Sequence, residues 1–206
     1  MENNNWSATW YNKIYCSNCG GIFELTTTRE CSVCGKQYVL DRHEAFAGAI
    51  PWTSHVLLKL MQEEWKRPFN TDLSQDIYFK TSQRVIIVLL FWTQFETLIE
   101  QLLSTGMRTL PQGVSKLLLN KYHQITSRLQ TLYPLLFQST LSKDLVALGY
   151  IELNKLLEEV RIKRNDFLHG KPEAIDEDLV QRTVQQIPNL QEAWIKIYNL
   201  RCTEVN

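Results

Sequence analysis

The chain has 206 residues, in which 22 lysines and arginines balance 22 aspartates and glutamates, and 44% of the residues are hydrophobic. This size suits one ordinary domain with a small appendage. A zero formal net charge excludes a protein that holds nucleic acid by bulk electrostatics, so any RNA contact must come from local patches. No secretory signal begins the sequence, and the longest apolar run, residues 85–92, is too short to span a bilayer. We therefore expect a cytoplasmic protein without a membrane partner.

Residues 1–12 are predicted to form an N-terminal arm. The arm is polar except for Trp6, Trp10 and Tyr11. Docking of these aromatic side chains on the body of the protein is the simpler interpretation, and stacking on the bases of single-stranded RNA is the alternative.

Two Cys-x-x-Cys pairs follow, and each pair is directly followed by glycine. They are Cys16 with Cys19 and Cys31 with Cys34, with eleven residues between the pairs. A two-residue gap lets one turn present two thiolates to a metal, and the stretches after each pair look like short strands. Residues 13–44 therefore resemble a zinc ribbon in which the four cysteines hold Zn²⁺ tetrahedrally. Disulfides or free thiols are the alternative, which only an oxidising compartment would favour.

The predicted zinc has a structural role, because four thiolates leave no open coordination position for water. Two metalloenzyme patterns are incomplete. His43 and Glu44 begin the zincin motif, but position 47 is alanine, and no His-x-Glu precedes the cysteine pairs as in a zinc deaminase. Acidic and basic residues are nearly balanced over residues 1–50, which argues against a DNA-binding regulator. The ribbon is suited to contact a partner protein, a second subunit or RNA.

From Pro51 onward the sequence has helical patterns, and residues 51–206 are predicted to form one helical domain. The expected helices cover residues 53–66, 74 or 76 to 105, 114–131, 141–147, 151–168 and 176–201. The second of these is apolar on all sides in its first part, which is typical of the central helix of a bundle. The predicted fold class is mainly α, a helical bundle preceded by a small β zinc ribbon.

The helix over residues 151–168 has a charged residue in its apolar stripe. Arg164 falls at the three-and-four spacing of the stripe, where a buried cation would need a partner. His169 follows at the expected helix end, before Gly170. Helical geometry separates these two residues by roughly 7–8 Å along the axis and about 140° around it. One chain therefore cannot easily aim both side chains at one atom, whereas two copies across a two-fold axis could. The stripe consists of Leu153, Leu156, Leu157, Val160, Phe167 and Leu168.

The string from Arg164 to His169, Arg-Asn-Asp-Phe-Leu-His, resembles the signature of the HEPN superfamily (higher eukaryotes and prokaryotes nucleotide-binding). Members are helical bundles, and many are metal-independent endoribonucleases whose active site forms at a homodimer interface. The resemblance implies attack of a ribose 2′-OH on the adjacent phosphorus of RNA. It also implies a toxin or antiviral-defence effector with an inhibitory or activating protein partner. Lys171 occupies the place where one branch has a modified tyrosine, so that modification is not expected.

The resemblance also implies roles for individual residues. His169 would transfer protons, Arg164 would stabilise the phosphorane oxygens, and Asn165 would orient the histidine or the phosphate. Glu96, on the long helix, is predicted to hold Arg164 in place. Residues predicted to guide the RNA backbone are Arg161, Lys163 and Lys171.

Each of these roles has a structural alternative. Arg164 and Glu96 could form a buried structural salt bridge, His169 could cap its helix, and the basic residues could form a solvated helix face. His55 and His123 are expected to be structural. At the level of the whole chain, the alternative is a non-catalytic zinc-ribbon and helical module that binds a partner protein or nucleotide.

Overall fold

The computed structural model describes residues 13–15, 19, 22–24, 30–37, 52–70, 81–111 and 113–202. The predicted arm, Cys16, the pair His43 and Glu44, and the predicted helix start at residue 74 or 76 lie outside the described residues.

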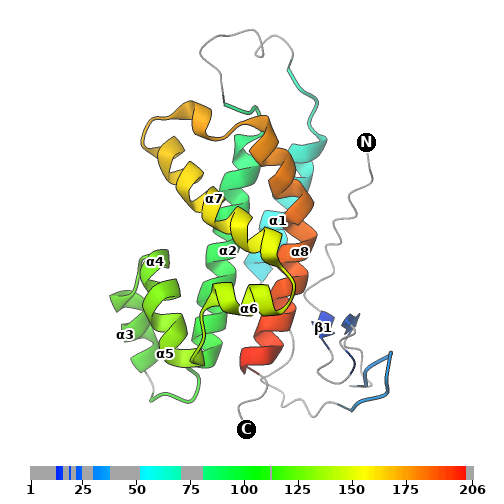
Figure 1. Ribbon diagram of the computed structural model, residues 1–206, viewed down its shortest axis with the longest axis vertical. Helices are drawn as coiled ribbons and strands as arrows, with labels where there is room; N and C mark the ends of the chain where they lie inside the picture. The colour runs from blue at the N-terminus through cyan, green and yellow to red at the C-terminus, as the bar shows by residue number, and fades with distance from the viewer. Residues whose placement is uncertain are drawn as a thin grey trace.

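Helices make up most of the described chain, as predicted, and form a bundle (Figure 1). The α-helices are α1 (Trp52–Lys66), α2 (Val85–Gly106), α3 (Val114–Lys121), α4 (Ile125–Ser127), α5 (Tyr133–Phe137), α6 (Leu141–Ala147), α7 (Ile151–Leu168) and α8 (Glu177–Cys202). A π-helical segment, η4 (Arg128–Leu132), joins α4 to α5, and a 3-10 turn, η5 (Pro172–Ala174), precedes α8.

Helix α2 is the centre of the bundle, as its apolar sequence predicts. Helices α1, α7 and α8 all pack against it, and Phe91 and Phe95 on α2 are completely or almost completely buried. The ring of Phe95 meets the buried Trp194 of α8 edge-on, with centroids 6.1 Å apart. In length and composition α2 is the one helix of the described residues that could cross a membrane. Its side chains instead supply much of the core of this bundle, which is the ordinary reason for such a helix in a folded domain.

The prediction that the α2 helix runs through Gln83 is wrong, because the helix begins at Val85. The preceding residues are bonded to the segment before α8. Ser82 donates its backbone N–H to the carbonyl of Ile175 at 2.9 Å and its hydroxyl to Glu177 at 2.5 Å. The Ser82 hydroxyl also accepts the backbone N–H of Arg84. These bonds hold residues 81–84 in a turn instead of a helix.

The prediction of one helix over residues 114–131 is also wrong. Helix α3 ends at Lys121, and the chain turns before α4 begins at Ile125. The carbonyl of Tyr122 in this turn accepts a hydrogen bond from Arg128 Nε at 3.0 Å. A long-range ion pair between Arg128 and Glu100 of α2 fixes the same side chain. The break therefore depends on contacts with α2 that residues 114–131 do not reveal.

Helix α7 has the predicted bounds, and α8 has nearly the predicted ones. Leu153, Leu156, Leu157 and Val160 of α7 are buried. The stripe does not continue as predicted, because Leu168 is 55% exposed. Figure 1 shows why: α7 crosses α2, and its C-terminal turns diverge from the bundle.

Two short strands lie beside the bundle. They are β1 (Lys13–Tyr15) and β2 (Ile22–Glu24), which pair antiparallel with Ile14 opposite Phe23. The backbone of β1 contacts α8, so the N-terminal segment is seated on the last helix (Figure 1).

Candidate functional site

The end of helix α7 brings His169 to the surface. Its backbone N–H donates to the carbonyl of Asn165 at 3.0 Å, and Gly170 takes the predicted left-handed conformation with φ +90°. The chain therefore turns away directly after the histidine. The imidazole is exposed and, within the described part of the chain, bonds to no helix carbonyl. The backbone N–H of His169 caps α7, so the imidazole side chain is not needed to cap the helix.

Arg164 is half-buried and has an unusual environment for such a cation. Its Nη1 donates to Oδ1 of Asn165 at 3.2 Å. Among the residues that the structure describes, no carboxylate lies within ion-pair distance of its guanidinium. Asn165, which was predicted to orient the histidine or the phosphate, thus contacts Arg164 instead, and the guanidinium keeps most of its donors available.

Glu96 is not joined to Arg164. Its Oε1 accepts a hydrogen bond from Trp92 Nε1 at 2.6 Å, one turn earlier on α2. In the described part of the chain no ion pair connects Glu96 with any arginine. The alternative of a buried Arg164–Glu96 salt bridge therefore finds no contact in the structure, and neither does a positioning role of Glu96 for Arg164.

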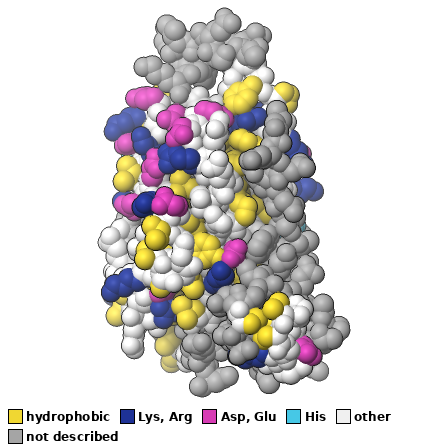
Figure 2. Space-filling model, turned by 45° about the vertical axis from the view of Figure 1, so that its right-hand side comes forward, with side chains coloured by type: hydrophobic (Ala, Val, Ile, Leu, Met, Phe, Trp, Pro, Cys, Tyr) yellow, Lys and Arg dark blue, Asp and Glu magenta, His cyan; other side chains and the backbone are white. Residues whose placement is uncertain are grey.

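The basic residues on either side of Arg164 are mostly neutralised. Arg161 donates twice to Glu158, at 2.5 and 3.0 Å, and this hydrogen bonding lowers the pKa of the Glu158 carboxyl. Lys171 pairs with Asp166 at 2.9 Å. Figure 2 shows Lys and Arg side chains interspersed with Asp and Glu over the upper part of one face, without a separate basic patch. Lys163 is half-buried and forms no ion pair with a described carboxylate.

Three of the four predicted metal ligands lie close together. The sulfur atoms of Cys19, Cys31 and Cys34 are all within 4.8 Å of one another and could hold a metal ion. The Cys19 and Cys31 sulfurs are 3.7 Å apart, far beyond a disulfide bond, whereas a tetrahedral zinc with bonds of about 2.3 Å separates its sulfurs by about 3.8 Å. Gly35 directly after the second pair has φ +72°, and its N–H bonds to the carbonyl of Cys31. The predicted fourth ligand, Cys16, lies outside the described residues.

The chain matches no family model, no curated protein and no solved structure in comparisons with known proteins. The resemblance to the HEPN superfamily therefore rests on the sequence of residues 164–169 and stays a prediction.

A cavity of about 540 Å³ beside α7 is a feature that sequence reasoning missed. Its lining comes from α2, the α4–η4 segment, α6 and α7, and the lining residues are up to about seventy positions apart along the chain. No local pattern brings such residues together, so the signal was absent from the sequence. The sequence analysis placed Leu157 in the buried stripe and Arg161 on the polar face of α7, but it predicted no cavity between them.

Proposed function

We propose that this protein is a metal-independent endoribonuclease whose active site contains Arg164, Asn165 and His169. The observation that carries the proposal is the charge at the end of α7. Arg164 has no carboxylate partner in the described part of the chain, while the neighbouring Arg161 and Lys171 are paired. A half-buried cation without a partner is costly unless it binds an anion. A phosphate of RNA supplies that anion, beside an exposed histidine whose side chain bonds to no described residue.

In the proposed reaction the ribose 2′ oxygen forms a bond to the adjacent phosphorus while the bond to the 5′ oxygen breaks. The guanidinium of Arg164 stabilises the charge on the phosphorane oxygens, for which its planar pair of donors is suited. His169 donates a proton to the leaving 5′ oxygen, and a second imidazole accepts the proton of the 2′-OH. The products are a 2′,3′-cyclic phosphate and a 5′-hydroxyl. Asn165 holds the guanidinium through its carbonyl oxygen. Glu96 has no part in this scheme.

The second imidazole belongs to another copy of the chain. One chain has a single histidine at this helix end, and Arg164 and His169 diverge around the axis of α7. The divergent turns of α7 also expose apolar side chains, with Ile162 at 47% and Leu168 at 55%. Covering them with the same surface of a second copy gives a two-fold interface next to the two residues.

The cysteine cluster is proposed to hold one structural Zn²⁺, with Cys16 completing the tetrahedron. The proposal is supported by the three described sulfurs and by the N–H of Val33, which donates to the sulfur of Cys31 at 3.4 Å. Bonds of this kind are usual around thiolates that bind a metal. The strand β1 leads into this cluster and contacts α8, so the zinc would hold the N-terminal segment against the bundle.

The test is cleavage of a labelled mixed-sequence RNA in the presence of EDTA, followed by end-group analysis. We expect wild type to leave cyclic phosphate ends, and His169→Ala and Arg164→Ala to lose about 10²–10⁴-fold in rate. His123→Ala and Arg67→Ala are matched controls, because both residues are exposed and lie outside the proposed site. A folded, dimeric, zinc-loaded protein that cuts no RNA would favour the alternative of a non-catalytic module that binds a partner.

The activity of such a nuclease has to be inhibited in a cell that contains its RNA substrate. We therefore include a regulatory protein partner, as in toxin–antitoxin or antiviral systems, in the proposal. Co-purification of the untagged chain from its native cells, followed by mass spectrometry, would identify such a partner. Association that His169→Ala leaves intact, together with inhibition of cleavage, would support its regulatory role.

A further inference from the structure

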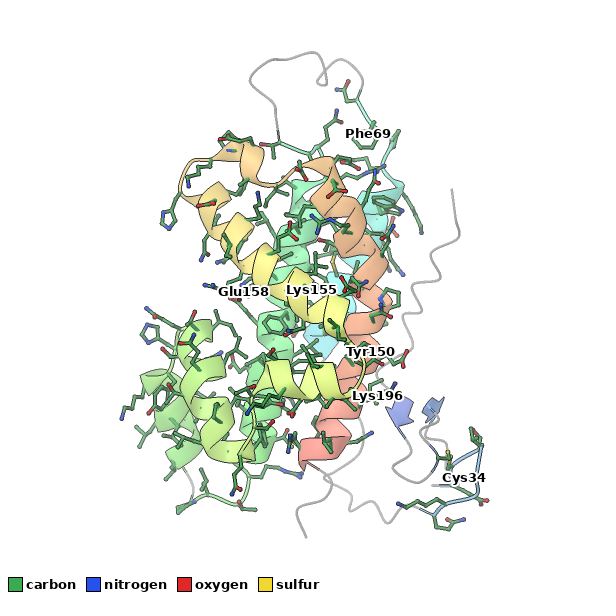
Figure 3. All side chains as sticks on the ribbon, in the orientation of Figure 1. Cys34, Phe69, Tyr150, Lys155, Glu158 and Lys196 are labelled. Atoms are coloured by element: carbon green, nitrogen blue, oxygen red, sulfur yellow. The ribbon has the colours of Figure 1, made fainter. Side chains whose placement is uncertain are left out.

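The cavity beside α7 has an apolar floor and an open polar rim. We call it the α7 pocket and define it by its floor and its neutral rim. The floor side chains are Trp92, Phe95, Leu129, Leu141 and Leu157, and the uncharged rim side chains are Thr126, Gln130, Thr140, Ser142 and Asn154. Glu158, labelled in Figure 3, lies on its α7 side. Its volume of about 540 Å³ is in the range of sites that enclose small organic groups.

Several rim groups are available for hydrogen bonding. Asn154 donates from Nδ2 to the hydroxyl of Ser142 at 3.0 Å, and no described donor reaches its Oδ1. The side chains of Thr126 and Gln130 form no hydrogen bond with any described residue. Two amides and two hydroxyls therefore present both donors and acceptors above an apolar surface.

The pocket has little net charge. Its two charged residues are Glu158 and Arg161, which neutralise each other through two hydrogen bonds. A ligand with a net charge would find no opposite charge there, and a purely apolar ligand would leave the amides without partners. The lining fits a flat, uncharged heterocycle with donors and acceptors along its edge.

We propose that the α7 pocket binds a nucleobase. The edges of nucleobases carry the mixed donors and acceptors that Asn and Gln side chains pair with, and single-stranded RNA is recognised mainly by bases that leave the stack. Arg161 at the rim precedes Arg164 by three residues, about 4.5 Å along the helix. A strand with a phosphate at Arg164 can thus place a neighbouring base in the pocket. This inference rests on the proposed function, because the base is taken to belong to the RNA substrate. Binding of that base would let the ribonuclease prefer some RNA sequences over others.

The test measures binding separately from cleavage. The four ribonucleosides are titrated singly by ligand-observed NMR, and a labelled 2′-O-methyl hexanucleotide of mixed sequence, which cannot be cleaved by its 2′ oxygen, is titrated by fluorescence anisotropy. The variant Asn154→Leu with Thr126→Val removes two of the five rim groups without adding charge. Asn120→Leu on α3 is the matched control, since Asn120 is exposed and does not line the pocket. Thermal unfolding of each protein checks that the fold is kept.

We expect the double variant to bind at least about tenfold more weakly than the control, the loss expected when a base edge loses its paired hydrogen bonds. An effect on free nucleosides shows that the base alone is recognised, and an effect on the hexanucleotide alone shows recognition within a strand. Equal affinities of the double variant and the control, or no binding of any probe, would overturn the proposal. His123→Ala, whose residue does not line the pocket, should bind as wild type does. If neither wild type nor any variant cuts RNA, but the double variant still binds the probes more weakly, the ribonuclease proposal is overturned. The proposal of a nucleobase pocket is then supported on its own.

Discussion

Among single residues, the buried Asp144 joins three segments of the bundle through the hydrogen bonds of its carboxylate. It accepts hydrogen bonds from Tyr133 at 2.5 Å, Ser139 at 2.6 Å and Arg201 at 2.9 Å. These partners come from α5, the α5–α6 turn and the end of α8. Asp144 is only 3% exposed. Burial would raise the pKa of its carboxyl, but the hydrogen bonds from Arg201, Ser139 and Tyr133 outweigh burial and lower it.

Replacing Asp144 by asparagine is expected to lower the free energy of unfolding by about 3 kcal/mol, because Arg201 would lose its carboxylate in a mostly buried place. Urea unfolding at pH 7 measures the change. Asp178→Asn is the matched control. It removes an exposed carboxylate that pairs with Arg182, and we expect a loss of less than about 1 kcal/mol. Similar losses in the two variants would contradict the structural role of Asp144.

The same carboxyl predicts a dependence of stability on pH. Its pKa is lower in the folded protein than in the unfolded chain, so its stabilisation is complete above the unfolded value of about 3.9. The stabilisation is lost as the pH falls through the lower folded value. Wild type and Asp144→Asn should therefore differ most at neutral pH and converge in acid. Unfolding curves between pH 7 and pH 3 test this, and a constant difference would show that the carboxylate charge is not the cause.

Cys202 illustrates a thiol without a chemical role. Burial raises its pKa to about 12, so almost none of it is thiolate at neutral pH. We expect iodoacetamide to leave Cys202 unmodified in the folded protein and to modify it in urea. Peptide mapping by mass spectrometry distinguishes it from the zinc-cluster cysteines. Fast labelling of Cys202 under native conditions would show that the end of α8 opens readily.

At the level of elements, local signals predicted some helices well and others badly. Helix α7 matched its predicted bounds because its stripe and Gly170 mark them within the sequence. The start of α2 was misplaced because the bonds of Ser82 reach Ile175 and Glu177, some ninety positions later. The turn between α3 and α4 was missed for the same reason, since Arg128 is held by Glu100.

The candidate site was predictable to the same extent. The spacing of the cysteines predicted the cluster of Cys19, Cys31 and Cys34, whereas a catalytic site at Arg164 and His169 stays a prediction. Predictions of contacts between side chains on different helices were less successful. Glu96 was chosen from its place on α2, but its bond to Trp92 depends on side-chain rotamers that a helical pattern does not specify.

If the cysteine cluster holds the proposed zinc, withdrawal of the metal should affect the N-terminal segment more than the bundle. The core around α2 contains no cluster cysteine, whereas small zinc-bound segments depend on their metal to fold. With a strong chelator, or in Cys34→Ser, we expect far-UV circular dichroism to retain its helical signal while limited proteolysis cuts residues 1–44 faster. Cys202→Ser is the control for loss of a cysteine outside the cluster. Collapse of the helical signal on chelation would show that β1 and α8 fold as one unit.

For the whole molecule, the zero net charge and the mixed surface limit how RNA can be bound. Many of the basic side chains that the structure describes are paired with carboxylates, so the proposed binding of RNA should neutralise few phosphates and depend weakly on salt. In the proposed function, affinity comes from Arg164 at the end of α7, from recognition of bases, and from the proposed second copy of the chain.

The two-fold arrangement makes a quantitative prediction for mixed dimers. If one cleft requires both imidazoles, a dimer is active only when both chains are wild type. Equal amounts of wild type and His169→Ala, allowed to exchange subunits, should then retain about a quarter of the wild-type activity, since one half multiplied by one half is one quarter for random pairing. If each chain instead had a complete active site of its own, the mixture would retain about half of the wild-type activity. A mixture of His123→Ala with wild type is the control, and its cleavage activity should equal that of wild type. Light scattering must show dimers in every mixture.

A separate variant, Ile162→Lys, places a charge in the apolar contact that the two copies are proposed to share. It should therefore weaken both dimerisation and RNA cleavage.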